Sequence, residues 1–221
     1  MNKVLLSWSS GKDSAWALHL LRQDPAMPIA ALLTTFNQAV DRVAMHAVRR
    51  ELVEAQASAA GLPLWPVPIP SPCPNEVYEE RMRVAMTRAR AAGFTHVAFG
   101  DLFLEDVRRY REERMAGTGL TPVFPVWAQP TGILARTMIE SGLDAIVTCV
   151  DPRQIAASFA GRRYDASLLH DLPASADPCG ERGEFHTFCC AGPMFTRPIA
   201  VETGEVVTRD GFVFADVVKG S

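Results

Sequence analysis

The feature that most constrains this chain is a short run of small polar residues near its start, Ser7-Trp8-Ser9-Ser10-Gly11-Lys12-Asp13-Ser14. An apolar segment precedes it at residues 4–6, and another follows at residues 15–21. This order predicts a buried strand, a tight loop and the start of a helix. Backbone N–H groups at a helix N-terminus lack intrahelical partners and carry partial positive charge, so such a loop suits a phosphate. The Lys12 ammonium and the neighbouring serine hydroxyls add further hydrogen-bond donors.

The Walker A loop, which also contains a Gly-Lys pair, is excluded. That motif requires a glycine five residues before the pair and a serine or threonine directly after the lysine. Here Leu6 and Asp13 occupy those two positions. A plain polar turn between a strand and a helix explains the glycine and the serines, but it does not explain Lys-Asp-Ser at the helix entry.

The loop instead resembles the Ser-Gly-Gly-x-Asp-Ser signature of the PP-loop ATP pyrophosphatases, with Ser10 where glycine is usual. Enzymes of this superfamily hold the β- and γ-phosphates of ATP and cleave it between the α- and β-phosphates. A serine keeps the backbone N–H but resists positive φ, so the substitution affects the geometry of the loop. The resemblance implies that ATP binds through Ser7, Ser9, Ser10, Gly11, Lys12, Asp13 and Ser14.

Length and composition are those of a soluble globular protein with one large domain or two small ones. The chain has 221 residues, of which 48% are hydrophobic and 21% are charged. Its net charge of −3 and pI of about 6.0 give no general attraction to nucleic acid. No apolar run reaches membrane-spanning length, and no signal-peptide pattern is evident. We therefore expect a cytoplasmic protein without membrane or nucleic-acid partners, and the oligomeric state stays open, with a homo-oligomer allowed.

The cysteines argue against a disulfide framework and against a zinc ribbon, because their number is odd and none has CxxC spacing. We expect most of them to be reduced, with Cys149 an ordinary core thiol in an apolar run. The five are Cys73, Cys149, Cys179, Cys189 and Cys190.

Strand-like and helix-like segments alternate through the first half of the chain. This alternation predicts an α/β fold with a doubly wound parallel sheet. The PP-loop resemblance implies the same Rossmann-type, adenine nucleotide alpha hydrolase-like domain. Strands are expected at 29–35, 64–70 (a proline-rich edge strand) and 96–101, helices at 43–60, 76–92 and 105–114, and the segment 123–127 closes the series.

Open α/β sheets bind ligands outside the carboxyl ends of their strands. In the resembling family a Met-His pair and an arginine from a following helix also lie near this cleft. The resemblance therefore implies that His46 lies on the nucleotide side of the cleft, and it makes Arg108 and Arg111 candidates for that arginine. For each of the three, a solvated position on the surface is the competing interpretation. The residues expected at strand ends beside the nucleotide are Thr34, Gly100 and Asp101.

The second half of the chain changes character, with a predicted helix, strand and short helix followed by a β-rich end. Hairpin turns are expected at Gly192-Pro193 and Asp210-Gly211. We place the boundary so that residues 1–126 form the PP-loop ATP-binding domain. Residues 127–221 then form a smaller C-terminal α+β domain, expected to bind substrate. The predicted helix, strand and short helix cover residues 131–141, 145–151 and 154–159.

A second informative stretch is Asp177-Pro178-Cys179-Gly180-Glu181-Arg182-Gly183-Glu184-Phe185-His186-Thr187. Three acidic groups, a histidine and a cysteine gather there around two glycines. A structural loop gains nothing from carboxylates that repel one another, so this density favours chemistry. A Cys179–His186 nucleophile pair or a metal site is disfavoured, because no third orienting group and no matching ligand spacing is evident.

Together the two motifs resemble the diphthine–ammonia ligase family, whose C-terminal signature is Glu-Gly-x-Glu-Phe/Tyr-His-Thr. The resemblance covers nearly the whole chain, residues 8–195. It implies an ATP-dependent ligase that adenylates a carboxylate, releases pyrophosphate and lets ammonia attack to form an amide and AMP. It also implies Mg²⁺ on the phosphates. The partners would be ATP, ammonia and a carboxylate acceptor, either a small molecule or a protein side chain.

Carried onto this sequence, the resemblance gives Asp13 the role of Mg²⁺ ligand and places three residues on the acceptor side as ammonia-positioning or general-base groups. Residues 100–106 depart from the Ser-x-Tyr-Gln-Arg-type sequence common in the diphthine enzymes. The acceptor, diphthine or another acid, therefore stays open. The catalytic candidates are Lys12 and Asp13 in the loop, and Glu181, Glu184 and His186 on the acceptor side.

Two other functions compete with the ligase. RNA-thiolating PP-loop enzymes commonly carry paired cysteines, a cluster site or an added RNA-binding domain. Only Cys189-Cys190 suggests this here, and adjacent residues of a strand point to opposite faces. A non-catalytic nucleotide sensor is disfavoured by the concentration of acidic residues and histidine at residues 177–186.

Overall fold

The computed structural model describes residues 1–43 and 47–220. Its elements in chain order are β1 (Val4–Ser7), α1 (Lys12–Arg22), β2 (Ile29–Asn37), β3 (Arg42–Val43), α2 (Arg50–Ala60), β4 (Leu64–Ile69), α3 (Asn75–Ala91), β5 (His96–Ala98), α4 (Glu105–Met115), β6 (Thr121–Val123), α5 (Thr131–Glu140), β7 (Asp144–Val150), the 3₁₀ turn η1 (Ala157–Phe159), α6 (Ala166–Asp171), β8 (Phe185–Ala191), β9 (Val201–Arg209) and β10 (Phe212–Lys219).

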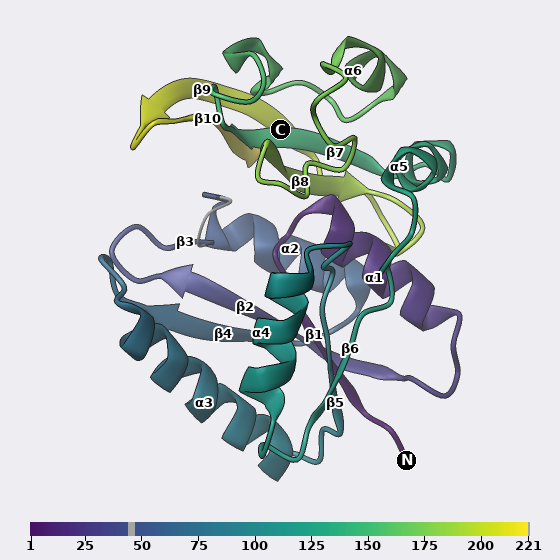
Figure 1. The fold of residues 1–221 in the computed structure, drawn as a ribbon, viewed down its shortest axis with the longest axis vertical. Helices are drawn as coiled ribbons and strands as arrows, with labels where there is room; N and C mark the ends of the chain where they lie inside the picture. The colour runs from purple at the N-terminus through teal and green to yellow at the C-terminus, as the bar shows by residue number, and fades with distance from the viewer. Residues whose placement is uncertain (44–46, 221) are drawn as a thin grey trace.

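The N-terminal half is built on a mostly parallel sheet (Figure 1). β1 lies between β2 and β5, β6 follows β5, and β4 pairs with β2 at the other edge. β3 alone runs antiparallel, against the end of β2. This arrangement confirms the predicted fold class, including β4 as the proline-rich edge strand.

Apolar side chains cover both faces of this sheet, because successive residues of a strand point to opposite sides. Leu6 belongs to the larger cluster, which includes α1 and α2, and Leu5 belongs to the smaller one with α3. A strand that is buried on both faces reads as a continuous apolar run, which is the pattern at residues 4–6. The sheet therefore lies between two helical layers.

The C-terminal half forms a four-stranded antiparallel sheet in the order β8-β7-β10-β9. Figure 1 shows this sheet stacked above α1 and α2. The larger apolar cluster continues from those helices into β7 and β8 without interruption. The second sheet is thus packed on the helical layer that begins at the polar loop after β1.

Several boundaries in the first half differ from the prediction; β5, for example, ends at Ala98 and not at residue 101. α2 begins at Arg50 and not at residue 43, because β3 pairs its two residues with Phe36 and Asn37. Gly61 ends this helix as predicted, in the left-handed conformation with a φ of 65°. The strand expected at 123–127 is β6, which starts two residues earlier, at Thr121, and is only three residues long. The prediction for His46 lies outside the described residues.

Two predictions in the second half were also wrong. The helix expected at 154–159 is only the turn η1, since the Asp151 carboxylate binds the Arg153 N–H at 3.0 Å and competes with helical bonding. Gly192-Pro193 does not turn a hairpin, because β8 pairs with β7 and β9 pairs with β10. Asp210-Gly211 does turn one, with positive φ at both residues. The domain boundary predicted after residue 126 falls between β6 and α5 and stays a prediction.

In the part of the chain that the structure describes, no helix combines the length and the apolar character needed to cross a membrane.

An ion-paired cluster joins the C-terminal sheet to the segment before α2. Asp216 on β10 accepts hydrogen bonds from Arg42 at 2.7 Å and from Arg49 at 2.5 Å. Burial favours the neutral carboxyl, but the two arginines outweigh it and lower the pKa of Asp216 to about 2. The cluster therefore stabilises the contact between the two halves only while Asp216 is ionised.

We predict that this cluster contributes about 1–2 kcal/mol at neutral pH, after allowance for screening by solvent. Because the folded-state pKa lies below the unfolded value of about 4, the contribution is present above pH 4 and is lost as the pH falls toward 2. Asp216→Asn should lower the urea midpoint at pH 7 and flatten its decline between pH 4 and pH 2. Glu202→Gln, at an exposed carboxyl of β9, is the control. If the urea midpoint falls equally steeply with pH in Asp216→Asn and in the parent protein, the assignment of this pH dependence to Asp216 is wrong.

Candidate active site

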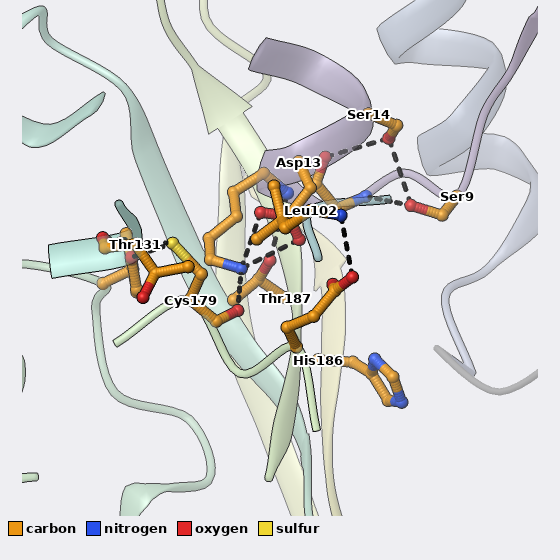
Figure 2. Close-up of polar contacts among 12 residues, drawn as sticks. Ser9, Asp13, Ser14, Leu102, Thr131, Cys179, His186 and Thr187 are labelled. Atoms are coloured by element: carbon orange, nitrogen blue, oxygen red, sulfur yellow. Dashed lines mark hydrogen bonds and ion pairs between the residues drawn. The ribbon is translucent and has the colours of Figure 1, made fainter. Parts of the chain in front are cut away.

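Hydroxyl groups close the loop between β1 and α1, as Figure 2 shows. The Ser9 hydroxyl accepts a hydrogen bond from the Gly11 N–H at 3.3 Å and lies 3.1 Å from the Ser14 hydroxyl. Ser14 also donates to the Gly11 carbonyl at 3.0 Å. The loop is therefore a tight turn in front of α1, with two serine hydroxyls on its surface.

Ser10 stands where the PP-loop signature has glycine, and it adopts the left-handed backbone conformation that glycine adopts most readily. Its φ is 71°, and its buried hydroxyl has no hydrogen-bond partner among the described residues. A left-handed conformation costs a residue with a Cβ about 1–2 kcal/mol. The Ser10 carbonyl accepts the Cys189 N–H of β8 at 2.9 Å, which holds the loop in this shape.

Lys12 connects the loop to the C-terminal half. Its N–H donates to the Thr187 hydroxyl at 3.1 Å, and its ammonium donates to both Asp13 oxygens, at 2.9 and 3.0 Å, and to the Cys179 carbonyl. Burial would lower the pKa of Lys12, but the neighbouring charge of Asp13 raises it above its ordinary value. The side chain is therefore a buried cation at the start of α1.

Gly100 lets the segment after β5 lie directly on the first turn of α1. A Cβ at Gly100 would be 2.9 Å from the Ser14 nitrogen and 3.0 Å from the Asp13 carbonyl carbon. Side-chain atoms essentially never approach the backbone this closely, so any other residue here would push the two segments apart. The neighbouring Asp101 carboxylate pairs with Arg111 at 3.4 Å.

Two of the acidic residues near the C-terminus hold their own loop in shape. The Asp177 carboxylate accepts the N–H groups of Cys179 and Glu181, both at 3.1 Å. The Glu184 carboxylate accepts the N–H groups of Asp177 at 2.7 Å and Arg182 at 2.9 Å. Backbone donors thus satisfy these carboxylates, which explains how a loop so rich in acid groups is stable.

Glu181 reaches across to the N-terminal half. Its carboxylate accepts the Leu102 N–H at 2.7 Å and the Phe103 N–H at 3.4 Å (Figure 2 shows the first of these bonds). Desolvation is the larger effect on its charge and raises the pKa of Glu181 to about 7. His186, nearby on β8, has its pKa lowered to about 4 by burial and by the charge of Lys12. At neutral pH the site therefore presents a half-ionised carboxyl and a neutral imidazole.

Both motifs line one cavity of about 480 Å³. Of the predicted residues that the structure describes, four lie outside this cavity, namely Thr34, Ser10, Gly11 and Glu184. The Thr34 hydroxyl donates a hydrogen bond to the Trp8 carbonyl. Arg111 lines the cavity, whereas Arg108 pairs with Glu112 and does not. The predicted residues that do line it are Ser7, Ser9, Lys12, Asp13, Ser14, Gly100, Asp101, Glu181 and His186.

Sequence reasoning missed part of the wall. Tyr78 and Met82 of α3 line the cavity, but neither was among the predicted site residues. Their spacing of four residues places them on one face of the helix, but the spacing does not show whether that face packs in the core or lines a cavity. Thr187 was part of the C-terminal motif but received no role, although its hydroxyl binds the Lys12 N–H.

The cysteines give no support to thiol or metal chemistry. All five are free, and desolvation raises the pKa of Cys179 to about 12, so its thiol stays protonated. The Cys179 thiol donates to the Thr131 carbonyl at 3.6 Å. Among the described residues, no group of three or more His, Cys, Asp and Glu is placed to hold a metal ion.

Comparison with known proteins decides the family. The diphthamide synthase N-terminal domain matches residues 2–121, and the diphthamide synthase C-terminal domain matches residues 130–220. The chain belongs to the diphthamide synthase family. Curated relatives named diphthine–ammonia ligase cover 95% of the chain: the Rattus norvegicus protein is 25% identical over 86% of its own length, the Danio rerio protein 27% over 90%, and the Homo sapiens protein 23% over 86%. The family predicted from the two sequence motifs is confirmed.

We predict that Ser10→Gly restores the usual family residue and stabilises the protein. It relieves the left-handed strain and removes a buried hydroxyl without a partner, for a gain of about 1 kcal/mol, or roughly 2–4 °C in melting temperature. Ser10→Ala is the matched control, because it removes the hydroxyl but keeps the strain. A melting temperature for Ser10→Gly at or below that of Ser10→Ala would contradict the strained geometry.

Proposed function

We propose that this chain is an ATP-dependent carboxylate–amine ligase that works through an acyl-adenylate and releases AMP and pyrophosphate. One observation carries the proposal: Lys12 and Asp13 of the phosphate loop and Glu181 of the C-terminal loop line the same cavity. Membership of the diphthamide synthase family and the ligase names of the relatives support it.

The loop supplies the binding site for the outer phosphates. The N-terminus of α1 contributes partial positive charge, and Lys12 contributes a full one in a buried setting where charges interact strongly. Positive groups fixed in advance stabilise the charge that develops on departing pyrophosphate. The hydroxyls of Ser9 and Ser14 line the same cavity and can donate to phosphate oxygens.

Mg²⁺ fits this cavity. The ion is usually bound through one or two carboxylates together with substrate phosphates, and Asp13 and Asp101 both line the cavity. We assign Asp13 as its ligand, with Asp101 as the second. Each carboxylate now pairs with a cation, Lys12 and Arg111 respectively, so binding would exchange one partner for another. When bound, the ion would neutralise phosphate charge.

The proposed reaction has two steps. An acceptor carboxylate oxygen attacks the α-phosphorus of ATP, the bond from that phosphorus to the bridging oxygen breaks, and pyrophosphate leaves. Ammonia nitrogen then attacks the acyl carbon, the bond to the adenylate oxygen breaks, AMP leaves, and the nitrogen loses a proton to a base. Dividing amide formation in this way replaces one difficult step by two easier ones.

Glu181 is the best placed base for that proton. A base works best when its pKa is near the working pH, and desolvation brings the pKa of Glu181 to about 7. The Leu102 N–H fixes the position of its carboxylate. His186 is neutral at this pH and is assigned to orienting the nitrogen, while Glu184 acts through the loop that it holds.

The acceptor is proposed only as a carboxylic acid. The relatives are named for diphthine. A second cavity of about 900 Å³, between α3 and α4, shares Tyr78, Met82 and Arg111 with the nucleotide cavity. It offers room for the body of an acceptor, with Arg111 at the junction to attract its carboxylate. Cys189 and Cys190 do not line the nucleotide cavity, so no observation favours RNA thiolation.

We predict that the purified protein, given ATP, Mg²⁺, ammonium and a panel of carboxylic acids including a diphthine-bearing elongation factor, releases pyrophosphate and AMP. Lys12→Met should lower turnover by about 10²–10³, because it removes a cation that stabilises the transition state. Lys219→Ala, at an exposed lysine of β10, should leave turnover unchanged. Release of orthophosphate would contradict the proposal, and tight ATP binding without turnover would favour a sensor.

We predict that Glu181 controls the second step alone. Since its raised pKa keeps it protonated below about pH 7, the amide-forming rate, measured at a fixed concentration of free ammonia, should rise as the pH passes from 6 to 8. Glu181→Gln should lose this rise and about 10² in rate while keeping acceptor-dependent exchange of pyrophosphate into ATP. Glu105→Gln, at an exposed carboxyl of α4, is the control. An unchanged pH profile in Glu181→Gln would remove it as the base.

A further inference from the structure

A buried amide lies behind the phosphate loop. Gln56 of α2 is fully buried, and its amide nitrogen donates to the Ser10 carbonyl at 2.9 Å and to the Cys189 carbonyl at 2.7 Å. Its amide oxygen accepts the indole N–H of Trp8 at 2.9 Å. One side chain therefore joins the loop, the residue before the loop and strand β8 of the C-terminal half.

The Ser10 carbonyl is the point where these bonds converge. It accepts both the Gln56 amide and the Cys189 N–H, at 2.9 Å each. The same residue has a φ of 71°, a conformation that a serine does not hold without support. The orientation of the peptide after Ser10 decides where the Gly11 N–H points, and this N–H donates to the Ser9 hydroxyl. A Ser10 carbonyl held from behind therefore helps to fix the Ser9 side chain, which lines the cavity.

We propose that Gln56 is a positioning residue for phosphate binding. It locks the left-handed peptide at Ser10 and couples the geometry of the loop to β8. The proposal rests on the assignment of this loop as the ATP site. Gln56 does not line the nucleotide cavity, so it acts through Ser10 and does not touch the substrate. The C-terminal half thereby takes part in binding the nucleotide as well as in holding the acceptor side.

The test uses Gln56→Met, which keeps the length and approximate volume of the side chain and removes its three hydrogen bonds. The Kd for ATP should rise by about tenfold or more, as expected when hydrogen bonds that fix a binding site are lost. The kcat at saturating ATP should change by less than about threefold, because the Lys12 ammonium, which stabilises the transition state, is held by Asp13 and the Cys179 carbonyl and not by Gln56. Val53→Ala, a buried apolar change on the same helix, is the matched control.

Amide hydrogen exchange of residues 8–14 in the protein without ATP gives a second, independent readout. It should be about tenfold faster in Gln56→Met and unchanged in Val53→Ala. Trp8 fluorescence should also shift in Gln56→Met, since its indole N–H loses its acceptor. If Gln56→Met does not fold, Gln56→Asn, which shortens the side chain by one methylene, replaces it and should change both readouts in the same direction.

The outcomes separate this proposal from the proposed function. Wild-type affinity for ATP and unchanged amide exchange in the Gln56 variant would overturn the positioning role. The role would also be overturned if the variant lost no more ATP affinity and amide protection than Val53→Ala does for the same loss of unfolding free energy. If the parent protein binds no ATP, the proposed function fails. The exchange of residues 8–14 then still decides whether Gln56 holds the loop.

Discussion

The fold depends on the contact between strand β8 and the phosphate loop. The Cys189 N–H binds the Ser10 carbonyl at 2.9 Å, and the Thr187 hydroxyl accepts the Lys12 N–H at 3.1 Å. These bonds join the two halves of the chain at the turn where α1 begins. Apolar packing of the second sheet on α1 and α2 supplies the driving force, and the hydrogen bonds fix the register of the contact. Because of this contact the C-terminal loop faces the phosphate loop across one cavity.

The charged side chains of the site differ in the partners that satisfy them. Asp177 and Glu184 are satisfied by backbone N–H groups of their own loop, and Lys12 is satisfied by Asp13 and a carbonyl. A buried cation is costly to desolvate, so the burial of Lys12 at the start of α1 points to a function. Glu181, which lies between the two halves, keeps a pKa near neutrality because burial opposes its charge more than its two backbone donors favour it.

Local sequence patterns were enough to predict the fold class, and the resemblance carried by the two motifs named most of the predicted residues that line the cavity. Continuous apolar runs gave β1 and β2, and Gly61 gave the end of α2. What sequence could not give depends on distant pairing. β3 exists because Arg42 and Val43 meet β2, and no local pattern shows that partner. Likewise, the spacing of Tyr78 and Met82 marks a helix face but not whether that face meets a core or a cavity. The roles of Glu184 and Gln56 appear only when their backbone partners are in place.

The proposed function requires that both motifs contact one nucleotide. A crystal structure with a non-hydrolysable ATP analogue and Mg²⁺ tests it most directly. We expect the β- and γ-phosphates within hydrogen-bonding distance of the Ser9 and Ser14 hydroxyls and the Lys12 ammonium, with the α-phosphate on the side of the loop that faces Glu181. Phosphates bound elsewhere, or a nucleotide that contacts the N-terminal half alone while Glu181 faces away from it, would contradict the claim.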